Sequence, residues 1–295
     1  SPYIRGLLRA RRTPTIPTTS NQLLARLSIM SRTKVVQLGA AGNLGTPVFD
    51  ALVREQKFDI TVVARTTSSF TTSDPSVKVA KIDYNDKQQL VDALRGNEIA
   101  LITLGDLSTL EQNSKLIIDA AIEAGVKKVI PSEYGNDLVN PPGNQHQIFS
   151  AKLNTAAYLR EKAEAGLIEY TLVTTGPFFD WGLKHEFLGF DFPNRKATIW
   201  SGGNDKINAT TLDSIARTVV YLVANPKSYT NTDVRVHDFF VSQNEILAIA
   251  EEETGSKFTI DNQDIEELLK TAGAGLAKGD YSLFNIYSVV KGNVF

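Results

Sequence analysis

Three glycines near the start of the chain have the spacing of a loop that binds phosphate groups. Gly39, Gly42 and Gly45 follow a mostly apolar run, residues 35–38, and an amphipathic run begins soon after them. This order predicts a buried strand, a tight turn and a helix whose free N–H groups and positive dipole end would bind a pyrophosphate. The alternative is a glycine turn with a purely structural role. We expect these residues to contact a dinucleotide: Gly39, Gly42, Asn43, Leu44 and Gly45.

An arginine follows the second predicted strand. Residues 59–64 form a mostly apolar run, and Arg65 closes it, twenty positions after Gly45. In such folds an acid near this place binds the ribose 2′-hydroxyl of NAD, whereas an arginine accommodates the 2′-phosphate of NADP. Thr66 adds a hydroxyl without a competing negative charge. We therefore predict NADP(H) as the cofactor, held by Arg65 and Thr66; the alternative for Arg65 is a solvated residue in a turn.

The elements that must position these residues alternate between strands and helices. After Arg65 the predicted strands are 77–82, 98–104 and 127–130, and the predicted helices are 88–94 and 110–124. An acid of residues 83–86 should cap the first helix, although Asp83 has an alternative place over the adenine, and Gly125 should end the second. The alternation predicts an α/β fold, a Rossmann-type doubly wound parallel sheet. Ligands lie at the carboxyl ends of such strands, so Thr103 and Gly105 join the predicted cofactor site.

The alternation becomes irregular in the last third of the chain. We predict an NADP-binding domain at residues 34–175 and a smaller α/β C-terminal substrate lobe at residues 176–295. The predicted elements of the lobe are a helix capped by Asp213 and ending at Ala224, one strand over 233–240, a capping box at 242–245 and a helix over 264–271. Because the chain stops in an apolar run, we expect the native protein to continue past Phe295.

Composition argues against several kinds of protein. The chain has 295 residues, 42% of them hydrophobic, which is enough for a full core. Its net charge of −2 gives no basic field for nucleic acid or a membrane surface, and no apolar run approaches the ~20 residues of a membrane span. The absence of cysteine excludes disulfides and thiol catalysis. The histidines, His146, His185 and His237, are far apart, so we expect no metal centre.

Residues 1–33 differ in composition from the rest. They contain six arginines and no acid, which is typical of a mitochondrial transit peptide. Alternatively Met30, the single methionine, is the natural start, and residues 1–29 are an upstream extension. Either interpretation predicts disorder before about Ser31. The first places the protein in mitochondria and the second in the cytoplasm.

A predicted helix that begins near Gln147 carries two candidate reactive lysines. Lys152 lies in its first two turns, whereas Lys162 lies about 15 Å further along, at 1.5 Å per residue. Tyr158 and Lys162 have the Tyr-x-x-x-Lys spacing that suits proton donation by a tyrosine of lowered pKa. The helix should present its reactive group at its own N-terminal end, near the mouth of the sheet, which favours Lys152. The Tyr158–Lys162 pair is the alternative.

Aromatic residues follow a further predicted strand at residues 170–173. Phe179 and Trp181 could wall a pocket for a flat, neutral substrate, or they could belong to the core that joins the two lobes. His185 is a candidate to donate a hydrogen bond to a substrate oxygen, or is simply an exposed histidine. The predicted contacts are Pro177 and Phe178 with the cofactor, and Tyr134, Phe179 and Trp181 with the substrate.

Several of these motifs together resemble the NmrA-like and isoflavone-reductase-like proteins, which are atypical short-chain dehydrogenase/reductases. The motifs are GAAGNLG at 39–45, Arg65, PSEYGND at 131–137 and GPFF at 176–179. The resemblance runs from about Lys34 to at least Pro226. It implies an NADPH-dependent reductase that transfers hydride to a phenylpropanoid- or quinone-like aromatic substrate. It also implies that Lys152 is the catalytic lysine, which holds the nicotinamide ribose and relays a proton.

The same resemblance implies a second possible function. Some NmrA-like proteins are redox sensors that bind a dinucleotide and regulate a partner protein without catalysis. Lys152 argues against this function, because a sensor has no need of a lysine there, and Arg65 argues against it because a sensor should tolerate both NAD and NADP. We expect a small-molecule substrate, a monomer or homodimer, and a protein partner only if the chain is a sensor.

Overall fold

The computed structural model describes residues 32–139, 147–292 and 294–295. The predicted leader therefore lies outside the described residues except for its last two positions, and Thr33 already belongs to the first strand. Within the described residues, no helix combines the length and the apolar character that crossing a membrane requires.

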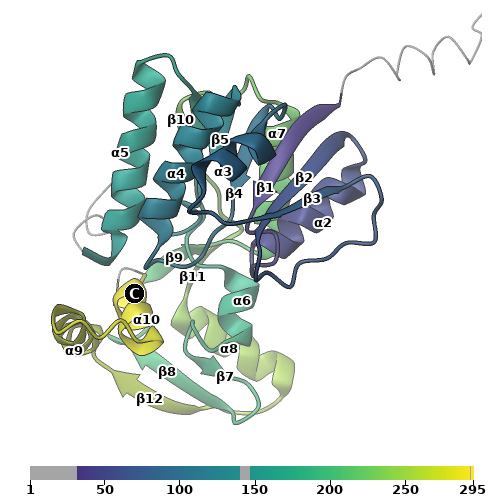
Figure 1. The fold of residues 1–295 in the computed structure, drawn as a ribbon. Helices are drawn as coiled ribbons and strands as arrows, with labels where there is room; N and C mark the ends of the chain where they lie inside the picture. Colours follow the sequence, from purple (N-terminus) through teal and green to yellow (C-terminus); the bar gives the residue numbers. More distant parts are fainter. Residues whose placement is uncertain (1–31, 140–146, 293) are drawn as a thin grey trace, which may run out of the picture. The chain divides into compact units, whose positions relative to one another are not determined.

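A parallel sheet of seven strands forms the centre of the described chain (Figure 1). Its strands are β1 (Thr33–Leu38), β2 (Phe58–Arg65), β3 (Lys78–Ile82), β4 (Ile99–Ile102), β5 (Lys128–Ile130), β6 (Glu169–Thr174) and β10 (Thr232–Arg235). Their order across the sheet is β10-β6-β5-β4-β1-β2-β3. Strands β2 and β3 lie on one side of β1, and the later strands β4, β5, β6 and β10 lie on the other side. Such a switch point opens a crevice beyond the carboxyl ends of β1 and β4, and the Rossmann-type prediction is confirmed.

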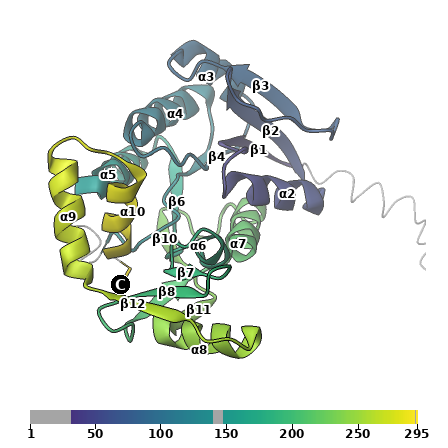
Figure 2. The same cartoon turned by 90° about the horizontal axis from the view of Figure 1, so that it is seen from below.

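Helices cover both faces of this sheet (Figure 2). On one face lie α2 (Gly45–Glu55) and α7 (Leu212–Ala224); on the other lie α3 (Lys87–Leu94), α4 (Leu110–Ala124) and α5 (Ser150–Glu164). Side chains alternate along each strand, so Val35 packs under the first pair of helices and Val36 under the other three. Both valines are fully buried, as expected for a sheet that is covered on both sides.

The predicted ends of two helices are confirmed. Gly125 follows α4 in the left-handed region, with φ of 78°, where a residue without a Cβ is least strained. Asp86 caps α3, because its carboxylate accepts a hydrogen bond from the backbone N–H of Gln89. Asp83 instead accepts from the N–H of Asn85, two residues on, within its own turn.

A second group of elements forms a smaller lobe. Its strands are β7 (Phe190–Asp191), β8 (Lys196–Trp200), β9 (Lys206–Ala209), β11 (Phe239–Ser242) and β12 (Thr259–Gln263). Its helices are α6 (Phe179–Lys184), α8 (Gln243–Thr254), α9 (Ile265–Ala277) and α10 (Leu283–Gly292). Strand β8 pairs with β7 and β12, and β9 pairs with β11. The small lobe has an apolar core of its own, in which Phe190 and Ile199 are buried. The predicted capping box is confirmed, since Ser242 and Glu245 cap the start of α8 reciprocally.

Two predictions about this part of the chain need correction. Residues 233–240 form two strands, because β10 pairs with β6 in the large sheet while β11 pairs with β9 in the small lobe. Helix α7 is capped by Thr211, whose hydroxyl accepts from the N–H of Ser214; Asp213 lies in the first turn instead and forms an ion pair with Arg217. Helix α7 and strand β10 both belong to the large sheet and its helices, so residues after 175 contribute to the large sheet as well as to the small lobe.

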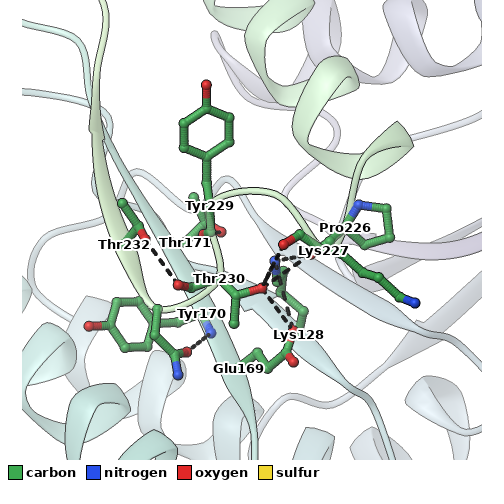
Figure 3. A network of polar contacts seen from close by, with 10 residues as sticks. Lys128, Glu169, Tyr170, Thr171, Pro226, Lys227, Tyr229, Thr230 and Thr232 are labelled. Carbon is green, nitrogen blue, oxygen red and sulfur yellow. Dashed lines mark hydrogen bonds and ion pairs between the residues drawn. The ribbon is translucent and has the colours of Figure 1, made fainter.

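A buried lysine fastens the segment between α7 and β10 to the amino end of the sheet (Figure 3). Lys128 begins β5 and its side chain is 2% exposed. Its ammonium donates to the carbonyl oxygen of Pro226 and, at 3.2 Å, to the hydroxyl of Thr230. Its Nζ also lies 3.9 Å from the carboxylate of Glu169. Polar protein groups thus surround this amine.

Candidate cofactor and active site

The glycine loop has the geometry that its sequence predicts. Gly39 has φ of +92°, and a Cβ built there would lie 2.6 Å from the carbonyl oxygen of Thr103. A Cβ on Gly45 would lie 1.9 Å from the carbonyl oxygen of Gly39, so only glycine lets the start of α2 approach the end of β1 this closely. The N–H of Gly42 donates to the Gly39 carbonyl at 3.0 Å and closes the turn.

A buried glutamine, for which we predicted no role, supports the glycine loop from strand β1. The side-chain amide of Gln37 in β1 donates to the carbonyl of Gly45 at 2.8 Å and contacts the hydroxyl of Thr103 at 3.4 Å. Thr103 in turn donates to the carbonyl of Leu38 through both its N–H and its hydroxyl, at 2.8 and 3.0 Å. Strands β1 and β4 are therefore joined by side chains at the point where the crevice opens. The signal in the sequence was a polar residue inside the apolar run of residues 35–38.

A cavity of about 210 Å³ lies over this loop at the carboxyl ends of β1, β2 and β4. Of the predicted cofactor residues, it brings together Gly39, Gly42, Arg65, Thr103 and Gly105. Asn43 and Thr66 are exposed beside the loop and outside the lining, while Leu44 and Gly45 are buried beneath it. The structure therefore unites three separate parts of the sequence in one concave site.

Arg65 is exposed at the end of β2 and lines this cavity. Two residues without a predicted role lie within reach of its charge. The pKa of Asp106 is lowered chiefly by a hydrogen bond from Ser108, with a further contribution from Arg65. Burial raises the pKa of Tyr84, whose hydroxyl donates to the carbonyl of Val63 at 2.8 Å, so the phenol stays neutral next to the arginine. Arg65 thus provides a permanent positive charge at one end of the cavity.

Lys152 lies in the first turn of α5, directly after the short 3₁₀ turn at Gln147–Phe149. Its ammonium donates to the backbone carbonyl of Glu133, and a Cβ on Gly135 would lie 3.2 Å from its Nζ. Burial lowers the pKa of Lys152, and the negative charge of Glu133 partly opposes this effect. The segment that follows β5 therefore holds the lysine in place.

Lys152 lines a second cavity, of about 270 Å³, which is distinct from the one over the glycine loop. The other polar groups in its lining are Glu133, Thr174 and the Arg160–Asp233 ion pair, whose atoms are 2.9 Å apart. Its apolar lining comes from Leu138, Val139, Leu153, Ala156 and Leu172. A hydrogen bond connects the linings of the two cavities, since the hydroxyl of Ser132, next to Glu133, donates to the carbonyl of Leu104 in the first.

The alternative pair, Tyr158 and Lys162, faces a different element. The Tyr158 hydroxyl donates to the carboxylate of Asp119 on α4 at 2.6 Å, and the Lys162 ammonium lies 4.5 Å from the centre of the tyrosine ring. Burial and then the Asp119 hydrogen bond raise the pKa of Tyr158, which is opposite to what a proton-donating tyrosine needs. Neither residue lines the two cavities described above.

The predicted aromatic contacts occupy different environments. Phe178 packs against the core under α2 and α7, and the Pro177 carbonyl accepts a hydrogen bond from the N–H of Thr210. Phe179 and Trp181 pack on the core of the small lobe, where the ring centre of Phe179 is 4.4 Å from that of Phe239.

Tyr134 and His185 also occupy different environments. Tyr134 is buried in the core of the large sheet, and burial raises its pKa; among the described residues its hydroxyl has no hydrogen-bond partner. Its ring is therefore part of the apolar core. His185 is exposed, with its ring 4.8 Å from that of Trp181. In the described chain, no group of three or more His, Cys, Asp or Glu side chains could hold a metal ion.

The seven-stranded order and the glycine loop define the class, a doubly wound α/β protein of Rossmann type. The model of the NmrA-like family matches residues 31–289, and the chain belongs to that family. Oxidoreductase aprR of Aspergillus flavus is 33% identical over 252 residues, which make up 83% of this chain and 82% of the relative. The isoflavone reductase homolog P3 of Arabidopsis thaliana is 29% identical over 258 residues, 81% of each chain.

A solved structure has the same fold. The binary complex of leucoanthocyanidin reductase with NADPH from Vitis vinifera matches with a TM-score of 0.71 at 18% identity, covering 89% of this chain and 86% of that one. The predicted family and fold are thereby confirmed.

Proposed function

We propose that this chain is an NADP(H)-dependent reductase of a small aromatic molecule. The observation that carries the proposal is the first cavity, in which the glycine loop and Arg65 meet at the carboxyl ends of neighbouring strands. The names of the two relatives above, an oxidoreductase and an isoflavone reductase homolog, support the reaction class. The NADPH bound by the leucoanthocyanidin reductase supports the cofactor.

The residues of the first cavity fit NADP(H). Gly42 is exposed at the turn, where a pyrophosphate can approach the backbone, and the N–H groups of Asn43 and Leu44 lie at the start of α2, whose dipole favours an anion. In this proposal Arg65 binds the 2′-phosphate, for which its planar, permanently charged guanidinium is suited. When bound, NADPH supplies the hydride.

Lys152 is the proposed proton donor. Strand β5, which leads to Glu133 and Lys152, lies two strands from β1, a separation of about 10 Å. An extended dinucleotide that starts at the glycine loop and follows the carboxyl ends of the strands would point its nicotinamide half toward Lys152. The ammonium, fixed by the Glu133 carbonyl, would then give a proton to the substrate atom that gains negative charge.

The small lobe supplies the proposed substrate wall. Phe179 begins α6 directly beyond the end of β6, and its ring contacts that of Phe239 at the start of β11. Phe239 is 39% exposed, which leaves part of this aromatic pair accessible. An apolar, flat surface of this kind suits a neutral aromatic substrate better than a sugar or an organic acid.

Oxidation of NADPH and of NADH in the presence of aromatic enones, quinones and aldehydes tests the proposal. The Arg65→Ser variant is measured beside the parent chain, with Arg95→Ser as a control because the side chain of Arg95 forms an exposed ion pair with Asp92 and lines neither cavity. We expect turnover with NADPH, and a KM for NADPH that rises about 10- to 100-fold in Arg65→Ser as a charge-assisted contact is lost. The KM for NADH in Arg65→Ser and the KM for NADPH in Arg95→Ser should change little.

No turnover with any substrate, together with equal affinity for NAD⁺ and NADP⁺, would refute the reductase and favour a sensor. Turnover that prefers NADH would instead refute the role of Arg65. The two results separate the reaction from the choice of cofactor.

A further inference from the structure

The second cavity brings a carboxylate to the lysine that the proposed reaction uses. Glu133 and Lys152 both line it, the first from the segment after β5 and the second from the first turn of α5. The ammonium is bonded to the backbone of Glu133, while the side chain of the same residue interacts with it electrostatically. One residue thus contributes two different groups to the environment of Lys152.

We propose that Glu133 is a positioning residue that acts through Lys152: its carbonyl fixes the ammonium, and its carboxylate keeps that ammonium charged inside the fold. This inference rests on the proposed function of Lys152. A lysine removed from water tends to lose its proton, and a nearby negative charge opposes that loss. A proton donor that had become a neutral amine could not deliver the proton that must accompany each hydride.

The other charges around the cavity leave this role to Glu133. Arg160 on α5 and Asp233 on β10 neutralise each other across 2.9 Å. Asp137, from the segment that follows Glu133, forms an ion pair with Arg235. The rest of the lining is apolar apart from the hydroxyl of Thr174. Glu133 is therefore the carboxylate whose charge is available to Lys152.

The charge of Glu133 is present at the pH where it is needed. Burial raises the pKa of Glu133 to about 6; Lys152 and Arg160 oppose this effect, whereas Asp233 adds to it. The side chain is consequently an anion at neutral and alkaline pH, the range in which a buried lysine would lose its proton. Below about pH 6 the carboxylate becomes neutral, and its electrostatic effect on Lys152 is lost.

The direct test measures the pKa of Lys152 in the cofactor-free chain, by NMR of ¹³C-labelled lysine side chains, with Lys152→Arg to assign the signal. In Glu133→Gln we expect the pKa of Lys152 to fall by about one unit, the effect of one nearby charge at intermediate dielectric. Glu161→Gln is the matched control, since Glu161 lies on the same helix but pairs with Lys162. Glu133→Asp, which retains the charge, should restore most of the difference.

The pH profile of kcat/KM for NADPH oxidation should follow the same shift. We expect the alkaline limb of the profile to move to lower pH in Glu133→Gln by the amount seen in the NMR titration. A loss of rate without movement of this limb would indicate a merely structural role and would overturn the inference, as would an unchanged pKa of Lys152.

A reciprocal measurement does not depend on the folding of Glu133→Gln. Coupling between two sites is mutual, so Lys152→Met must raise the pKa of Glu133 by a similar amount, followed with ¹³C-labelled glutamate. An unchanged titration of Glu133 would overturn the inference. If the two pKa values prove coupled but the parent chain oxidises no NADPH, the proposed function is refuted, whereas the electrostatic coupling of Glu133 to Lys152 is still supported.

Discussion

Lys128 and Lys152 lie at opposite ends of the same sheet and share most of their local chemistry. Lys128 starts β5, and Lys152 is bonded to the segment that leaves the other end of β5. Each ammonium donates to a backbone carbonyl, that of Pro226 for the first and that of Glu133 for the second. Each has a glutamate nearby, and burial lowers the pKa of both.

What differs is access. The side chain of Lys128 is 2% exposed and is surrounded by Pro226, Thr230 and Glu169, which link two parts of the chain (Figure 3). The side chain of Lys152 faces a cavity of about 270 Å³. A lowered pKa therefore marks a buried lysine, while the space beside the amine distinguishes a candidate donor from a structural link.

The strongest test of this comparison is the removal of Lys152. In Lys152→Met we expect kcat/KM for NADPH oxidation to fall about 10²- to 10⁴-fold, the usual contribution of a positioned proton donor. The free energy of unfolding in urea should change by no more than about 1 kcal/mol, because the flexible methionine fills the space and Glu133 lines a cavity large enough to hold water. Retention of full activity would remove Lys152 from the mechanism.

The opposite pattern is expected for Lys128. In Lys128→Met the free energy of unfolding should fall by about 1–3 kcal/mol, since the partly buried carbonyl of Pro226 loses its donor. The value of kcat should stay within about threefold of the parent. Lys127→Met is the control, because Lys127 is the neighbouring residue but its ion pair with Glu98 is exposed. A large loss of kcat without loss of stability would contradict the comparison.

The same variant gives a pH dependence with a definite sign. Because burial lowers the folded-state pKa of Lys128 below its ordinary value of 10.5, the unfolded chain binds more protons between these two values. The part of the stability that depends on this titration therefore rises as the pH increases through that window, and at lower pH only the contribution of the hydrogen bonds is left. Urea unfolding at neutral pH and near pH 10 should show a wider gap between parent and Lys128→Met at the higher pH.

The smallest effect is expected for Tyr158. In Tyr158→Phe the hydrogen bond to Asp119 is lost, and the free energy of unfolding should fall by about 1 kcal/mol. Activity should stay within about twofold, because the hydroxyl points to α4 and not toward Lys152. Tyr221→Phe serves as the control, being 53% exposed on α7. A hundredfold loss of activity would restore the Tyr158–Lys162 pair as the catalytic one.

Much of the fold follows from short-range pattern in the chain. The boundaries of α4 were predicted to the residue. Its apolar residues recur with the period of a helix and a glycine that can adopt positive φ follows it, and both are properties of neighbouring residues. The glycine loop was predictable for the same reason. By contrast, Asp213 and Thr211 are both good capping residues, and only the direction in which the chain enters α7 decides between them.

The residues of the candidate site were predictable in part. Gly39, Gly42 and Arg65 could be placed together because parallel strands bring their carboxyl ends to one edge. Tyr134 is an aromatic residue of the kind that lines substrate pockets, yet its ring packs into the core. The Arg160–Asp233 pair joins residues 73 positions apart, so no local pattern could have predicted it.

The sequence by itself determined the alternation of strands and helices, the phosphate-binding loop and the arginine suited to NADP, because each depends on neighbouring residues. The tertiary structure decided that Lys152 faces a cavity, that Lys128 is enclosed, and that β10 returns to the large sheet. These outcomes depend on contacts between distant segments, and their energies are set by burial and access to water, which no short stretch of sequence encodes.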